Sequence, residues 1–197
     1  PLPPTGSTYD YFVEINDSGG KFAPWKSVVP TFTFDSDQPY TAIVVPTEDT
    51  TRFNFLMRSL ITQNKPVFLA GVTGTGKTVM IQNTLRSLEP LVEDGGLGLL
   101  PMFLNVSAQT SSLVTQQSIE AKLEKKRKNL LGAPAGRKIV VMIDDVNMPL
   151  VETYGAQPPV ELLRQFLDFK GFYDRDKLFW KDIVDTMFFT AAAPPGA

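Results

Sequence analysis

Four short apolar runs punctuate the chain, and each has the length of a buried β-strand. They occupy residues 66–70, 102–106, 138–143 and 186–191. The third run is apolar at every position from Ile139 to Ile143, without the alternation of a strand that faces water on one side. This pattern predicts a central strand of a parallel sheet, with both of its faces covered.

The segments between these runs carry helical spacing or polar residues that favour a helix start. After the first run, Ile81, Leu85 and Leu88 fall on one helical face. The expected helices cover, approximately, residues 47–64, 77–88, 112–128 and 160–168. The alternation of strands and helices predicts an α/β fold of three layers, with helices on both sides of a parallel sheet.

Two segments lie outside this alternation. Residues 1–41 are rich in proline, glycine and aromatic residues and lack helical spacing. We expect them to form an extended arm, with a strand at residues 9–15 and a turn at residues 17–20. Residues 171–180 predict a β-hairpin insert. We therefore divide the chain into the arm, residues 1–41, and one α/β domain, residues 42–197.

A glycine-rich motif follows the first apolar run. Its sequence is Gly71-Val72-Thr73-Gly74-Thr75-Gly76-Lys77-Thr78, which fits the phosphate-binding Walker A pattern G-x-x-x-x-G-K-[ST]. Such a loop turns its backbone N–H groups toward phosphate oxygens, and the helix that follows adds the positive end of its dipole. Lys77 brings a mobile positive charge to the outer phosphates, and the Thr78 hydroxyl can ligate Mg²⁺. A chance glycine-rich turn is the alternative, which the flanking strand and helix disfavour.

A pair of carboxylates, Asp144 and Asp145, ends the third apolar run and fits a Walker B pattern. Carboxyl ends of parallel strands lie at one edge of a sheet, where ligands bind, so both motifs are expected to meet there. Asp144 is placed to hold Mg²⁺ directly or through water, and Asp145 to orient an attacking water. The alternative is an aspartate pair at a turn with no chemical role.

Composition and charge exclude several classes of binding and catalytic site. Net charge is −2, which gives no argument for binding nucleic acid or an anionic membrane. No apolar run approaches the roughly 20 residues of a membrane-spanning helix. The chain has no histidine and no cysteine, which excludes Ser-His triads, His-bound zinc and disulfides. It starts at Pro1 without Met, and we interpret it as part of a longer polypeptide.

Two further segments leave alternatives open. Residues 43–46 are either ordinary core or an apolar rim for a purine base, formed by Val44, Val45 and Pro46 with Val79 at the loop. Residues 120–128 carry many charges, which are typical of a solvated helix face, while a basic patch for a partner is the alternative.

The motifs together resemble the large subdomain of an AAA+ ATPase module, and more specifically the dynein heavy chain. The resemblance is carried by residues 144–149, 154–159, 161–165 and 171–174, which read DDVNMP, YGAQPP, ELLRQ and GFYD. The lead-in at residues 45–50 and the arm around Trp25 resemble the third module of the motor ring in an axonemal dynein.

This resemblance implies a site for ATP or ADP with Mg²⁺, shared with neighbouring AAA+ modules of the same heavy chain. Val44, Val45 and Pro46 would flank the adenine, while Lys77 and Asp145 would act in catalysis. The full-length protein would contact microtubules and dynein intermediate and light chains, in the cytoskeleton or the axoneme of a cilium or flagellum.

Two residues depart from the usual AAA+ pattern. Asp145 stands where glutamate is usual, and its carboxylate is one methylene shorter. Ala193 stands where a polar sensor residue is expected, after the fourth strand. Both changes leave nucleotide binding intact and weaken the case for hydrolysis, because positioning dominates phosphoryl transfer. A slow regulatory ATPase and a structural module that binds nucleotide without hydrolysing it therefore both remain open, and an unrelated P-loop enzyme ranks below them.

Overall fold

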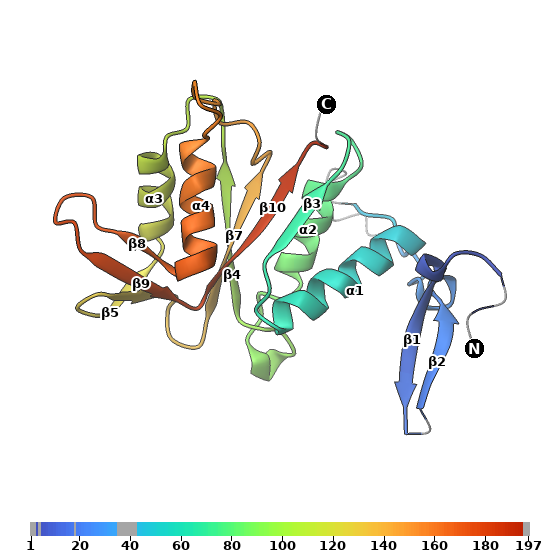
Figure 1. Ribbon diagram of the computed structural model, residues 1–197. Helices are drawn as coiled ribbons and strands as arrows, with labels where there is room; N and C mark the ends of the chain where they lie inside the picture. The colour runs from blue at the N-terminus through green and yellow to red at the C-terminus, as the bar shows by residue number, and fades with distance from the viewer. Residues whose placement is uncertain (1–2, 4, 18, 35–42, 195–197) are drawn as a thin grey trace. The chain divides into compact units, whose positions relative to one another are not determined.

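The computed structural model describes residues 3, 5–17, 19–34 and 43–194 (Figure 1). The chain divides into two compact units, Pro1–Arg58 and Ser59–Ala197, and helix α1 (Glu48–Thr62) contains the boundary. The expected boundary between residues 41 and 42 lies outside the described residues and stays a prediction. Residues 195–197, which follow the fourth predicted strand, also lie outside the described residues.

The first unit contains a β-hairpin. Strand β1 (Tyr11–Asn16) pairs antiparallel with β2 (Gly19–Pro24), so the predicted strand is confirmed, while Gly19 and Gly20 of the predicted turn belong to β2. Two short 3₁₀ helices flank it, η1 (Thr8–Asp10) and η2 (Trp25–Val28). The buried ring of Trp25 packs against Phe12 and Phe55, with ring centroids 4.8 and 5.4 Å away. The hairpin, η2 and α1 of the first unit therefore share an aromatic cluster.

A four-stranded parallel sheet forms the centre of the second unit. Its strands, in spatial order, are β3 (Val67–Ala70), β10 (Thr186–Ala192), β7 (Lys138–Asp144) and β4 (Leu99–Asn105). All four predicted strands are confirmed. Strand β4 starts three residues earlier than expected and includes Pro101, which an edge strand tolerates because one side of its backbone needs no partner. The carboxyl ends of β3 and β7 are separated only by β10, which brings both motifs to one edge.

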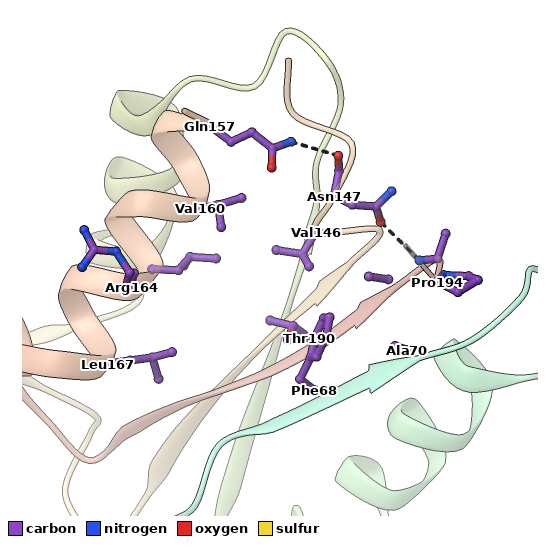
Figure 2. A pocket seen from close by; sticks show the side chains of 13 residues that line it. Phe68, Ala70, Val146, Asn147, Gln157, Val160, Arg164, Leu167, Thr190 and Pro194 are labelled. Carbon is purple, nitrogen blue, oxygen red and sulfur yellow. Dashed lines mark hydrogen bonds between the residues drawn. The ribbon is translucent and has the colours of Figure 1, made fainter. Parts of the chain in front are cut away.

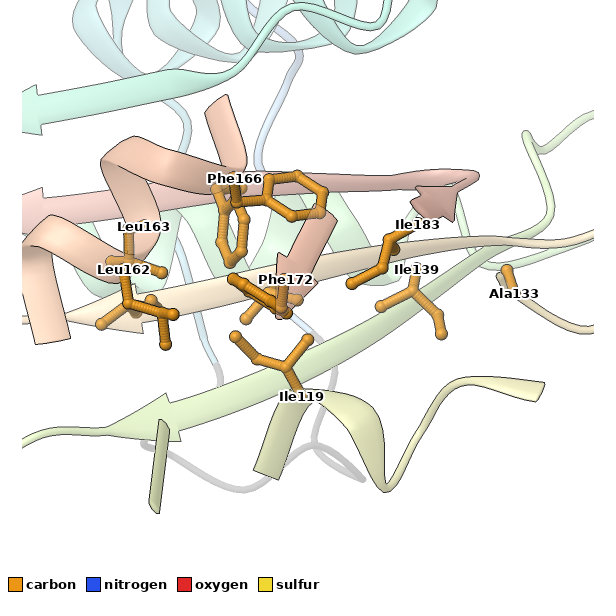
Figure 3. Packing of buried hydrophobic residues seen from close by; sticks show 11 residues of the cluster. Ile119, Ala133, Ile139, Leu162, Leu163, Phe166, Phe172 and Ile183 are labelled. Carbon is orange, nitrogen blue, oxygen red and sulfur yellow. The ribbon is translucent and has the colours of Figure 1, made fainter. Parts of the chain in front are cut away.

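Helices cover both faces of this sheet, which confirms the predicted three layers (Figure 1). Helix α2 (Lys77–Arg86) contacts β4, β7 and β10 on one face. Helices α3 (Ser112–Glu120) and α4 (Pro158–Phe169) pack together on the other. An apolar cluster lies on that side (Figure 3), and its members are Ile119, Ala133, Ile139, Val141, Ile143, Leu162, Leu163, Phe166, Phe172, Ile183 and Phe188. Val140 and Met142 of β7 are buried as well, as expected of a strand covered on both faces.

A second, smaller sheet extends the fold. Its strands, in spatial order, are β5 (Glu124–Arg127), β6 (Leu130–Gly132), β9 (Trp180–Val184) and β8 (Gly171–Tyr173). The antiparallel pair β8–β9 confirms the predicted hairpin insert. One short 3₁₀ helix, η4 (Val92–Asp94), lies in the connection before β4.

The predicted helix over residues 112–128 is wrong in its second half. Helix α3 ends at Glu120, and residues 124–127 instead pair antiparallel with β6. Pairing with a strand outweighs the helical propensity of a glutamate- and lysine-rich segment, since propensity is a weak preference that tertiary contacts override. All four residues of β5 are exposed at the sheet edge, where charges discourage pairing with another chain.

A polar cluster fastens the hairpin insert to α3. The ammonium of Lys181 donates to Glu120 Oε2 at 2.7 Å and pairs with Asp174 Oδ2 at 3.4 Å. The buried amide of Gln116 donates to Glu120 Oε1 at 2.7 Å and accepts from Arg175 Nε at 2.7 Å. Every polar group named here has a partner, so the cluster fixes the hairpin without leaving a buried charge uncompensated.

We expect Asp174 to make the stability of the second unit sensitive to acid. The backbone N–H of Lys177 donates to its carboxylate and, with the N–H of Asp176 and the Lys181 ammonium, holds the pKa of Asp174 below its ordinary value. A lowered native pKa stabilises the fold above the unfolded-state value of about 3.9, and this contribution is lost as pH falls through the native pKa.

Urea unfolding of Asp174→Asn between about pH 6 and pH 2.5 tests this expectation. The parent should be more stable than the variant at the upper pH, and the gap should close as the pH falls. Asp176→Asn is the control, because it removes the same charge while Asp176 contributes its backbone N–H to the turn. A gap that stays constant with pH would contradict the assignment.

Candidate nucleotide and magnesium site

The glycine-rich loop connects the end of β3 at Ala70 to the start of α2 at Lys77. Gly74 and Gly76 have φ angles of +84° and +80°, in the left-handed region that favours glycine. Gly71 lies outside that region, and a Cβ added there would meet only ordinary contacts at 3.6 Å. The conformational need for glycine in this loop is therefore strongest at Gly74 and Gly76.

Lys77 lies against the loop that precedes it. Its Nζ donates to the carbonyl of Gly71 at 2.7 Å and to that of Val72 at 2.9 Å. The Thr75 hydroxyl also donates to the Val72 carbonyl, at 2.9 Å. The loop thus curls around a half-buried ammonium at the N-terminus of α2, where the helix dipole adds to its positive charge. This arrangement suits an anion.

The structure brings Thr78 and Asp144 into direct contact, although they are 66 residues apart in the sequence. The Thr78 hydroxyl donates to Asp144 Oδ2 at 2.6 Å, and both residues are half-buried. Adjacent ligands of an octahedral Mg²⁺, at about 2.1 Å from the ion, lie about 3 Å apart. The hydroxyl and carboxylate oxygens are about 0.4 Å closer than two such ligands, so a small separation would let both contact one hard cation.

Magnesium needs few protein ligands when phosphates supply the rest. In the part of the chain that the structure describes, no group of three or more Asp, Glu, His or Cys residues gathers as a metal cluster. Thr78 and Asp144 place two oxygen atoms close together, which is the number that such a site requires from the protein.

Asp145 follows with an unusual backbone. Its φ of +48° places it in the left-handed region, which aspartate tolerates better than most residues. Its N–H donates to Asp144 Oδ1 at 3.0 Å, and its carbonyl accepts from the N–H of Met148 at 2.8 Å. The side chain is exposed to solvent. The role of Asp145 in orienting water stays a prediction.

A family model described as the P-loop containing dynein motor region matches residues 32–197. The chain belongs to this family. The match covers both Walker motifs, and the described fold is the α/β architecture of a P-loop AAA+ domain with a parallel sheet.

The relatives of this dynein chain include axonemal heavy chains. It is 45% identical over 195 residues to dynein axonemal heavy chain 6 of Homo sapiens, covering 99% of this chain and 4% of that one. It is 40% identical over 212 residues to dynein axonemal heavy chain 1 of Mus musculus, covering 99% of this chain and 5% of that one. A solved structure of C. elegans PCH-2 covers 80% of this chain and is itself covered to 41%, at 13% identity and a TM-score of 0.43.

The dynein chain described here spans only a small part of these relatives, 4% and 5% of the first two named. Within the described residues, no helix is both long enough and apolar enough to cross a membrane.

Sequence reasoning missed Asn147, which lies just beyond the Walker B residues of this dynein chain. Its side-chain oxygen accepts from the backbone N–H of Ala193 at 3.3 Å (Figure 2). Its own backbone carbonyl accepts from the side-chain amide of Gln157 at 3.0 Å. A polar residue two positions after the aspartate pair was the available signal, although nothing in the sequence showed that it would reach Ala193.

A cavity of about 630 Å³ lies between α4 and strands β3 and β10 (Figure 2). Its lining residues are Phe68, Ala70, Val146, Asn147, Gln157, Val160, Leu163, Arg164, Leu167, Thr190, Ala192, Ala193 and Pro194. The lining includes Ala70, which precedes the glycine-rich loop, and no residue from 71–78. Arg164 pairs there with Glu161 at 2.6 Å, and both side chains are exposed.

The residues predicted to contact adenine lie in both units. Val44, Val45 and Pro46 belong to the first unit, while the loop and Asp144 belong to the second. Their role as a rim for adenine stays a prediction. Val79, in the first turn of α2, is 39% exposed and adjoins Thr78.

Proposed function

We propose that this chain is the large subdomain of a nucleotide-binding AAA+ module, the third in the motor ring of an axonemal dynein heavy chain. Nucleotide bound at this module would regulate the motor cycle. The observation that carries the proposal is the 2.6 Å hydrogen bond between Thr78 and Asp144, which joins the two Walker motifs at one edge of the sheet. Family membership and identity to axonemal heavy chains support it.

Each part of the site has a separate task in this proposal. Backbone N–H groups of residues 72–78 and the Lys77 ammonium hold the phosphates of ATP or ADP. Thr78 and Asp144 hold Mg²⁺, which when bound neutralises phosphate charge and polarises the transferred group. Val44, Val45, Pro46 and Val79 contact the base and sugar side of the nucleotide.

Hydrolysis at this site is proposed to be slow, with Asp145 orienting the attacking water. Its side chain is shorter than that of glutamate, and Ala193 offers a methyl group where a polar sensor side chain is usual. A site that binds nucleotide without hydrolysing it is the second candidate. The observation in its favour is that the Ala193 N–H is already bonded to Asn147.

Replacing Asp145 with asparagine separates these two candidates. Asparagine tolerates the left-handed backbone as well as aspartate does, so the fold is preserved. If Asp145 acts on water, we expect single-turnover hydrolysis at this site to fall by about 100-fold or more, with ATP affinity unchanged within about threefold. Turnover at this site is measured as the difference in single-turnover ATP hydrolysis between the full heavy chain and its Lys77→Ala variant. Equal turnover in parent and variant would favour the non-hydrolysing candidate.

The wider setting follows from the relatives and is proposed on the same terms. Neighbouring AAA+ modules of the same heavy chain would complete the site, and the full-length protein would engage microtubules and the intermediate and light chains. The expected location is the cytoskeleton and the axoneme of a cilium or flagellum, because the relatives are axonemal heavy chains.

A further inference from the structure

One peptide unit lies between the two Walker motifs and is hydrogen-bonded on both sides. The carbonyl of Ala192 accepts from the N–H of Gly71, the first residue of the glycine-rich loop, at 3.2 Å. The N–H of Ala193 belongs to the same planar peptide and donates to Asn147 Oδ1 at 3.3 Å. A rotation of this peptide would therefore disturb the glycine-rich loop and the turn after Asp145 together.

Asn147 is itself held by two elements. The left-handed turn at Asp145 leaves the N–H of Val146 bonded to the carbonyl of Ala191 at 3.0 Å, so the chain stays beside β10 after β7 ends. The side chain of Gln157, just before α4, donates to the carbonyls of Asn147 and Pro149 at 3.0 and 2.6 Å. Figure 2 shows the Asn147 side chain reaching from this turn toward the chain before Pro194.

We propose that Asn147 is a positioning residue for the nucleotide site. Its side-chain oxygen fixes the peptide between Ala192 and Ala193, and through that peptide the start of the glycine-rich loop. Asn147 thereby adds a polar contact to the backbone at the end of β10, where Ala193 has only a methyl side chain. The inference depends on the proposed function for its link to nucleotide, and on the observed hydrogen bonds for its link to the loop.

The first measurement needs no nucleotide. Residue-resolved hydrogen exchange of the full heavy chain should show Asn147→Ala raising exchange at the Ala193 amide by about fivefold, the change expected from losing one neutral hydrogen bond. Exchange at the Gly71 amide should rise with it. Asn147→Asp keeps an oxygen acceptor and should restore both amides toward the parental rates. Asn129→Ala is the matched control, because Asn129 is an exposed asparagine in the turn between β5 and β6 and its loss should leave both amides unchanged.

The second measurement links Asn147 to nucleotide. Release of a fluorescent ATP analogue from this site should be about fivefold faster in Asn147→Ala than in the parent, and unchanged in Asn129→Ala. Release from this site is identified as the part of the release signal that is absent in Lys77→Ala. Parental exchange rates at Gly71 and Ala193 in Asn147→Ala would overturn the proposal, as would parental release from a site that depends on Lys77. Release that does not depend on Lys77 in the parent would instead contradict the proposed function.

Discussion

Replacing Lys77 with alanine is expected to abolish nucleotide binding at this site. The ammonium lies inside the loop, within 2.7 Å of the Gly71 carbonyl, and carries the positive charge that the phosphates require. Hydrogen bonds to charged groups contribute about 1.5–3 kcal/mol each, so losing contacts to two phosphates predicts an affinity loss of about 100-fold or more. Equilibrium titration of the full heavy chain with a fluorescent ATP analogue should lose one class of site.

Lys65→Ala is the matched control for this prediction. Lys65 is an exposed lysine in the same unit, just before β3, and removing it changes the net charge equally. Nucleotide occupancy of the site in Lys65→Ala should equal that of the parent. If Lys77→Ala also kept parental occupancy, the loop would not be a phosphate site.

Truncating Phe166 to alanine is expected to cost about 3–5 kcal/mol of unfolding free energy. Its side chain is fully buried, and its ring packs against Phe172 and Phe188 at centroid distances of 5.6 and 4.8 Å (Figure 3). The change would open a cavity where α4, the hairpin insert and β10 meet. Helix α4 follows Gln157, which holds the turn at Asn147. This core therefore also supports the edge of the sheet where the two Walker motifs meet.

Phe169→Ala on the same helix provides the comparison. Phe169 is 66% exposed, so its truncation should change the unfolding free energy by about 0.5 kcal/mol or less. Urea unfolding of both variants measures the difference. Similar losses for Phe166 and Phe169 would mean that the cluster on this face is not the main core.

The sequence predicted the features that local pattern specifies. The run from Ile139 to Ile143 is apolar at every position, which a short strand buried on both faces accommodates. The loop at residues 71–78 has a fixed spacing tied to one backbone shape, so its place between β3 and α2 followed directly. The contact of Thr78 with Asp144 required only that the two strands be parallel and close.

Features that depend on distant partners were missed. Residues 124–127 have helical propensity, and only their pairing with β6 makes them a strand. Strand β2 contains Gly19, Gly20 and Pro24, which lower strand propensity, yet pairing with β1 defines it. Asn147 has no local signature, because its partner lies 46 residues away at the end of β10.

In the proposed site, Thr78 and Asp144 share one cation beside the glycine-rich loop. The test is a titration with ATP, once with Mg²⁺ and once with a chelator. The quantity measured is the gain in affinity that Mg²⁺ gives at the site that Lys77→Ala removes. We predict that Thr78→Val and Asp144→Asn each remove most of this gain and that the double variant loses no more than either single one, since both act on one ion. Variants that keep the parental gain, or whose losses add, would contradict a shared magnesium site.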